Sequence, residues 1–185
     1  MKETGLILKA PMVLSILEGR KTQMRRVLNN QRAYDLDKAP LGQPGDRIYV
    51  RETWAQMELQ PDGHCPIAYM ATDDGSAIID GRWKPSSHMP KWAARIWLEV
   101  IGVRVERLQD ISEEDALAEG VFKKLGSSPV GDDVETATRD RLIYSAPTQA
   151  REAFARFWES AGGDWDANPG VWVVDFKVLS TTGKP

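Results

Sequence analysis

Four cations stand within seven residues near the start of the chain, in the segment Gly-Arg-Lys-Thr-Gln-Met-Arg-Arg at 19–26. The four are Arg20, Lys21, Arg25 and Arg26. The whole chain has a formal net charge of -3, so this cluster is a local reversal of sign. A positive cluster on an acidic protein is typical of a site for an anion such as phosphate, a nucleotide or nucleic acid. Because a short apolar run ends at Gly19, we expect an exposed functional loop or strand to begin there.

The composition is that of a globular protein with an uneven charge distribution. Hydrophobic residues make up 42% and charged residues 28% of the 185 positions, which favours one soluble domain spanning 1–185. Residues 1–60 hold ten Lys/Arg and seven Asp/Glu, a net of +3, so the remainder carries -6. One cysteine and two histidines argue against a disulfide and a structural zinc site, and we expect no metal or other cofactor.

No segment approaches the ~20 consecutive apolar residues of a membrane span. The N-terminus opens on charged residues and has no apolar signal region. These two features predict a cytoplasmic protein with no membrane partner.

Hydrophobic periodicity predicts a mixed α+β fold. Strands are expected at 5–9, 46–54, 67–70, 94–108 and 170–178, with extended chain at 21–27. Helices are expected at 11–17, from a Ser112 cap to residue 119, and at 150–161. The apolar pattern changes phase at Ile101–Gly102, which predicts a β-bulge. The number of strands favours a closed or nearly closed small barrel flanked by helices, with a polar insertion at about 123–148.

Several segments occur in an order that resembles one family. They lie at 19–26, 45–54, 98–108, 111–120 and 171–176, with further motifs at 83–92 and 165–169. Together they resemble the ASCH-domain proteins, in the long form found in phages and prophages. The resemblance implies a PUA-like β-barrel of about five to seven mostly antiparallel strands that binds RNA or modified nucleotides. Some ASCH relatives hydrolyse the acetyl amide of N4-acetylcytidine and related acylated cytosines, and others cleave single-stranded RNA.

The resemblance also assigns catalytic positions. In the amidohydrolase group a lysine, a threonine and a glutamate act together, and by motif position these are Lys21, Met24 and Glu119. Met24 departs from the pattern, because a thioether has no proton to lose and cannot form an acyl ester. Three routes stay open: Thr22 supplies the hydroxyl, Lys21 and Glu119 activate a water, or the site binds a base without cutting it.

Further residues are candidates for contacts to the substrate or nucleic acid. Arg20, Arg25 and Arg26 can contact phosphate or form structural ion pairs. Arg51 and Glu52 are neighbours on a strand, so one faces inward; Glu52 can accept from a cytosine amino group, or pair with an arginine inside the barrel.

The Trp54 side chain can stack on a base or belong to the core. Lys84 and His88 lie in the proline-rich segment 83–92, where His88 can act as a general acid or base for RNA cleavage or hold a turn.

These residues leave three functional hypotheses. The leading one is a metal-independent hydrolase of an N4-acylated cytidine-type nucleoside or nucleotide. The alternatives are a ribonuclease for single-stranded RNA and a non-catalytic module that binds RNA or a modified nucleotide.

Overall fold

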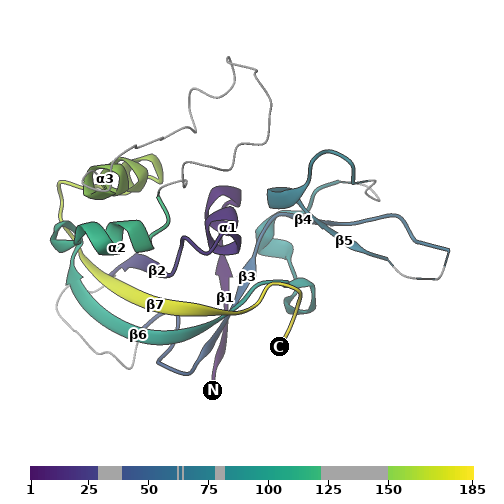
Figure 1. Ribbon diagram of the computed structural model, residues 1–185, viewed down its shortest axis with the longest axis horizontal. Helices are drawn as coiled ribbons and strands as arrows, with labels where there is room; N and C mark the ends of the chain where they lie inside the picture. The colour runs from purple at the N-terminus through teal and green to yellow at the C-terminus, as the bar shows by residue number, and fades with distance from the viewer. Residues whose placement is uncertain (29–38, 62, 64, 78–81, 122–149) are drawn as a thin grey trace, which may run out of the picture.

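The computed structural model describes residues 1–28, 39–61, 63, 65–77, 82–121 and 150–185 (Figure 1). The predicted insertion at 123–148 lies outside the described residues. None of the described helices is both long enough and apolar enough to span a membrane.

The main sheet has five strands in the order β1-β3-β6-β7-β2. Their bounds are β1 Glu3–Ile7, β2 Gln23–Val27, β3 Arg47–Arg51, β6 Trp97–Arg107 and β7 Gly170–Ser180. Strands β1 and β3 are parallel, and the other three pairings are antiparallel. A separate two-stranded antiparallel sheet joins β4 Trp54–Gln56 to β5 Ile67–Tyr69, and it projects away from the long β6–β7 ribbon in Figure 1.

Within the described residues, three α-helices accompany the sheets. They are α1 Ala10–Leu17, α2 Glu113–Ala118 and α3 Ala150–Ser160, and short 3₁₀ turns lie at Met70–Thr72, Ser86–His88, Lys91–Ala93 and Leu108–Asp110. Pro11 lies in the first turn of α1, where its fixed φ and missing N–H cost nothing. The Ser112 hydroxyl caps α2 by accepting from the Asp115 backbone N–H at 3.0 Å, as predicted.

The mixed α+β prediction is confirmed, but the described strands do not complete a barrel. Strands β1 and β2 are the two outer strands of the sheet, and α1 is the connection between them. The sheet therefore wraps around a core and leaves one open side, at which α1 lies (Figure 1). Of the two expected forms, closed or nearly closed, the described strands do not form a closed barrel.

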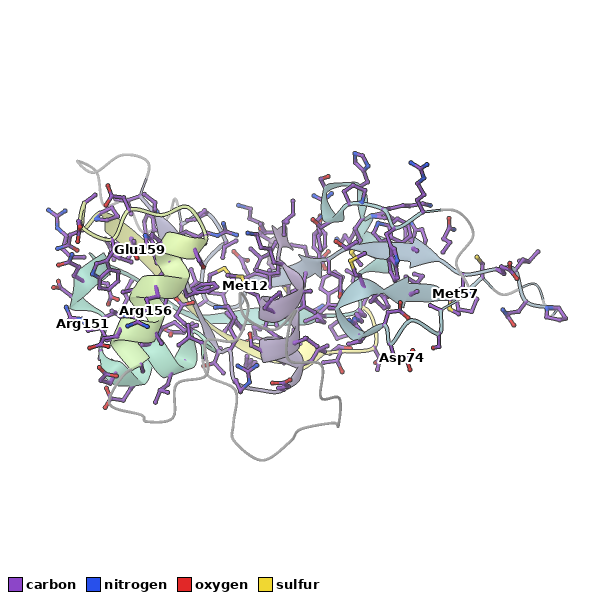
Figure 2. All side chains as sticks on the ribbon, turned by 90° about the horizontal axis from the view of Figure 1, so that it is seen from above. Met12, Met57, Asp74, Arg151, Arg156 and Glu159 are labelled. Carbon is purple, nitrogen blue, oxygen red and sulfur yellow. The ribbon has the colours of Figure 1, made fainter. Side chains whose placement is uncertain are left out.

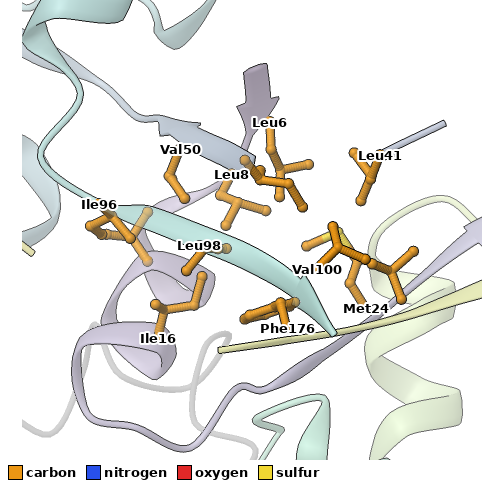
Figure 3. Close-up of a cluster of buried hydrophobic side chains, with 13 residues drawn as sticks. Leu6, Leu8, Ile16, Met24, Leu41, Val50, Ile96, Leu98, Val100 and Phe176 are labelled. Carbon is orange, nitrogen blue, oxygen red and sulfur yellow. The ribbon is translucent and has the colours of Figure 1, made fainter. Parts of the chain in front are cut away.

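The main core fills the concave side of this sheet. Thirteen buried apolar side chains from all five strands, α1 and the segment after residue 38 form one cluster, and Figure 3 shows them converging. Ile48, Leu98 and Val13 have no exposed surface at all. A second buried cluster, which includes Phe154 of α3 and Ala116 of α2, lies beneath those two helices and includes Val171 and Val173 of β7. The two helices are thereby fixed against the β6–β7 ribbon.

The predicted β-bulge is present in β6. The register against β7 shifts between Val100, which is opposite Phe176, and Gly102, which is opposite Asp175. Beyond the shift the two strands stay paired as far as Arg107 and Gly170. The shift lies at the position where the apolar pattern changes phase in the sequence.

Candidate functional site

A cleft of about 780 Å³ opens at the unpaired side of the sheet. It lies between the end of β1, the first turn of α1, strand β2 and the C-terminal half of α3. Figure 2 labels Met12 of α1 and Arg156 of α3, which line it from two different helices. Apolar side chains form most of its wall: Ile7, Leu8, Met12, Met24, Val27, Phe154, Phe157 and Trp158.

A buried ion pair lies in the wall of this cleft. The Lys21 amine donates to a Glu119 carboxylate oxygen at 2.6 Å and to the Glu119 backbone carbonyl at 2.9 Å. The side chains of Lys21 and Glu119 are 0% and 3% exposed. The two backbones also form an isolated antiparallel bridge, so the chain itself brings this lysine and this carboxylate together.

Gly120 makes that close approach possible. Its φ is +78°, a left-handed conformation that ends α2 and favours glycine. A Cβ at this position would lie 2.8 Å from Cβ of Lys21 and 3.0 Å from Cβ of Ser15. The Arg20 guanidinium donates to the Gly120 carbonyl at 2.6 Å and to Glu18 at 2.7 Å. Arg20 thus stabilises the turn that follows Glu119.

Arg25 holds the second oxygen of Glu119 at 3.2 Å. Its guanidinium is fully buried, and it also donates to Gln23 and to Glu106, each at 2.5 Å. Asp115 accepts from Arg25 at 3.2 Å, and the Phe154 ring lies 5.6 Å from the guanidinium carbon. The Glu119 carboxylate is therefore held in one orientation by two cations, Lys21 and Arg25.

The network continues to the surface through Asp115 and Arg104. Arg104 donates to Asp115 at 2.6 Å and to Asp175 at 2.9 Å, and Gln23 bridges Asp115 and Asp175 through its amide nitrogen. Burial raises the pKa of Asp115, but the Gln23 hydrogen bond and the charges of Arg104 and Arg25 outweigh it. The pKa of this carboxyl consequently lies below its usual range.

The position of the expected nucleophile is apolar in structure as well as in sequence. Met24 is 4% exposed, belongs to the main core and contributes to the cleft wall. Thr22 is exposed and does not line the cleft. Two backbone hydrogen bonds fix Thr22. Its N–H donates to the Ala118 carbonyl, and its own carbonyl accepts from the Phe176 N–H. The geometry therefore brings Lys21 and Glu119 together but does not bring Thr22 to them.

Arg51 and Glu52 lie outside the cleft. Glu52 is 1% exposed and takes both of its hydrogen bonds from Arg95, at 2.9 and 2.8 Å. Arg51 donates to the backbone carbonyls of Met89 and Ser87. Of the two alternatives for Glu52, the buried pair is the one observed, although its partner is Arg95 and not the adjacent arginine.

Trp54 and Lys84 contact each other beside the two-stranded sheet, and His88 lies four positions after Lys84. Trp54 is buried, and the Lys84 amine lies 4.8 Å from its ring centre. Trp92, which is exposed, meets the Trp54 ring edge-on at 5.9 Å. His88 is exposed at the end of the turn Ser86–His88. None of these four described residues lines the cleft that contains Lys21 and Glu119.

Sequence reasoning missed the residues that α1 and α3 contribute to the cleft. Lys9 and Arg156 add charge, and Phe157 and Trp158 add flat apolar surface. The helical pattern at 150–161 was visible, but nothing local showed which core or cleft the helix would cover. Among the described residues, no group of three or more His, Cys, Asp or Glu is arranged to hold a metal ion.

Comparison with known proteins gives fold-level similarity. No family model matches the chain, and no curated protein matches it. The chain is similar to an ASCH domain. That structure, from Lactobacillus crispatus JV V101, has 15% sequence identity and a TM-score of 0.41, over 97% of this chain and 80% of the other. A protein of Enterococcus faecalis V583 with the family model DUF984 has 13% identity and a TM-score of 0.43, over 97% and 77%.

Proposed function

We propose that this chain is an ASCH-type protein whose cleft binds a cytidine-type nucleoside or nucleotide modified at N4. The observation that carries the proposal is the Glu119 carboxylate in the cleft wall, held by Lys21 at 2.6 Å and by Arg25 at 3.2 Å. A fixed carboxylate is the acceptor that suits the N4 nitrogen of cytosine, which keeps one hydrogen after acylation.

Lys21 can complete the recognition of the base edge. An ammonium group has three N–H donors, and two of them go to Glu119. The third can donate to a ring nitrogen or carbonyl oxygen of the base, so the pair offers one acceptor and one donor. Cytosine presents the complementary order, a donor at N4 beside acceptors at N3 and O2.

The wall around the pair suits a flat ring. Met24 borders the cleft on the sheet side, and Phe157 and Trp158 border it on the α3 side. Apolar and aromatic surfaces bind an unstacked base in most single-nucleotide sites. The apolar wall therefore supports binding of one base, with polar selection by Lys21 and Glu119.

Calorimetric titration with N4-acetylcytidine, cytidine and uridine tests this proposal. Uridine carries a carbonyl at position 4, which the Glu119 carboxylate repels, so we expect it to bind at least about tenfold more weakly than cytidine. Glu119→Gln should lose this discrimination, because an amide can either accept or donate. Glu99→Gln, at a surface pair with Lys177, is the matched control. Equal affinity for uridine and cytidine, or no binding of any of the three, would contradict the proposal.

Hydrolysis of the N4 amide by water is the second candidate function. It is favoured by the position of the Lys21 amine beside a carboxylate in the same cleft. Glu119 would take a proton from water as the water oxygen attacks the acyl carbonyl, and Lys21 would stabilise the oxyanion. The C–N bond then breaks, and the same proton passes to the departing amine, giving cytidine and a carboxylic acid.

Release of acetate from N4-acetylcytidine measures this second function. We expect turnover without added metal, lowered by at least about a hundredfold in Lys21→Ala. A wild-type protein that binds the nucleoside but releases no acetate would leave binding as the function. The ribonuclease hypothesis gains no support from the geometry, because His88 does not line the Lys21 cleft.

A further inference from the structure

The cleft is strongly positive for a protein of this composition. Among the described residues, five cations and one carboxylate line it. The cations are Lys9, Lys21, Arg25, Arg26 and Arg156, and the carboxylate is Glu119. Five minus one leaves +4 at the lining, whereas the whole chain has a net charge of -3. Charge of one sign gathered in a concave site attracts a ligand of the opposite sign.

Two of these cations are already engaged by acids of the chain. Lys21 pairs with Glu119, and Arg25 pairs with Glu106, Asp115 and Glu119. Both side chains are 0% exposed. They position the carboxylate and are not the groups that would meet the anionic part of a ligand.

The cations at the mouth of the cleft are different. Lys9 precedes α1, Arg26 lies on β2, and both are exposed. Within the described parts of the chain, neither side chain makes a hydrogen bond or an ion pair. Arg156 reaches the cleft from α3, on another wall (Figure 2). Lys9 and Arg26 thus offer their charges to a ligand in the cleft.

One cation that contacts Glu119 and one exposed cation of the cleft are neighbours on β2. Arg25 touches the Glu119 carboxylate, and Arg26 is the next residue of β2, a step of ~3.3 Å along the strand. Successive residues of a strand point to opposite faces, so Arg25 goes to the buried network and Arg26 to the mouth. Because β2 is an outer strand of the sheet, Arg25, Arg26 and Glu119 nevertheless all line the same cleft.

We propose that Lys9 and Arg26 form a phosphate subsite, so that the ligand is a phosphorylated cytidine and not a free nucleoside. This inference rests on the proposed function, since the base is what places the phosphate. The shared chemistry is a phosphate ester on the sugar, which can be the monoester of a free nucleotide or a diester of a strand.

The test compares the affinities of N4-acetylcytidine, its 5′-monophosphate, and a dinucleotide that contains the same base, by calorimetry at low and high salt. The monophosphate is expected to bind about tenfold more tightly than the nucleoside at low salt, with a smaller advantage at high salt because ions screen exposed charges. A preference for the dinucleotide would assign the subsite to a diester, and a preference for the monophosphate to a free nucleotide.

Single variants test whether Lys9 and Arg26 cause the affinity gained from the phosphate. Arg26→Ala and Lys9→Ala should each reduce the ratio of nucleoside Kd to monophosphate Kd by about two- to threefold. Arg107→Ala, an exposed arginine at the end of β6 outside the cleft, is the matched control and should leave that ratio at the wild-type value.

Two failures can be told apart. If the nucleoside binds and the phosphorylated ligands bind no better, the phosphate subsite is overturned while the proposed function stands. If no ligand binds, the proposed base recognition is overturned. It is also overturned if affinity depends on the phosphate alone and Glu119→Gln leaves every Kd unchanged.

Discussion

The Lys21 amine and the Glu119 carboxylate are 2.6 Å apart, although 98 positions separate them in the chain. The lysine also donates to the Glu119 carbonyl, so it fixes both the backbone and the side chain of its partner. Both groups are almost without exposed surface. The pair therefore has a structural role whatever ligand the cleft takes.

The contributions of Lys21 and Glu119 to stability should be coupled. Lys21→Met leaves a buried carboxylate with one fewer cation, and we expect the free energy of unfolding to fall by about 3–5 kcal/mol. Lys21→Met combined with Glu119→Leu should lose clearly less than the sum of the two single changes. Urea unfolding of the four proteins measures the coupling. Strictly additive losses would mean that the two charges do not interact.

A hydroxyl at position 24 should raise the turnover of N4-acetylcytidine. In Met24→Thr the new oxygen would lie in the cleft wall near Lys21, where it can be acylated. We expect release of acetate at least about tenfold above wild type, together with a stability loss of about 2 kcal/mol from the core. Met89→Thr, a buried methionine of another cluster, controls for the stability loss. A folded Met24→Thr protein without added turnover would argue against an acyl-transfer geometry at this cleft.

Gly120 should tolerate no side chain. Gly120→Ala places a Cβ in a left-handed backbone and within 2.8 Å of Lys21, so both strain and crowding apply. Gly75→Ala is the matched control, because its φ is +88° but no atom lies within 4 Å of its added Cβ. Thermal unfolding should show Gly120→Ala to be less stable than the control by about 1 kcal/mol or more. Equal losses would show that the approach of Lys21 imposes no constraint.

Asp115 should make the protein sensitive to acid. Burial opposes its ionisation, yet Gln23, Arg104 and Arg25 hold its folded pKa below the ordinary value near 3.8. A group with a lowered folded pKa contributes stability above its unfolded pKa, and this contribution disappears as the pH falls through the folded pKa.

Measurements of unfolding free energy between pH 7 and pH 2 check this expectation. Wild type should lose stability below about pH 4, and Asp115→Asn should show a smaller loss over the same interval. Asp166→Asn, at an exposed site, should follow the wild-type curve. An identical pH profile for wild type and Asp115→Asn would exclude a contribution from this carboxyl.

The elements with local signals were predictable from the sequence. The apolar, β-rich segment 170–178 corresponds to β7, and the serine before an acidic turn corresponds to the cap of α2. In both cases the sequence signal lies within a few residues. The phase change at Ile101–Gly102 also has a purely local cause, and it located the bulge.

The partners of charged residues were not predictable in the same way. Alternation indicated that one of Arg51 and Glu52 faces inward, but nothing near Glu52 in sequence points to Arg95, 43 positions later. Lys21 and Glu119 were linked only by the family motifs. The α3 wall of the cleft depends on how a helix lies on the β6–β7 ribbon, which is a tertiary property.

The bulge in β6 determines which side chains of the strand face the core and which face away from it. Before it, Leu98 and Val100 belong to the main core; after it, Val103 takes their place against the same cluster. Strict alternation would instead have sent Arg104 and Glu106 into the hydrocarbon interior. Deleting Ile101 would therefore remove the bulge but keep Val103 and Val105 on the same face as Leu98 and Val100, so Arg25 should keep its contact with Glu106.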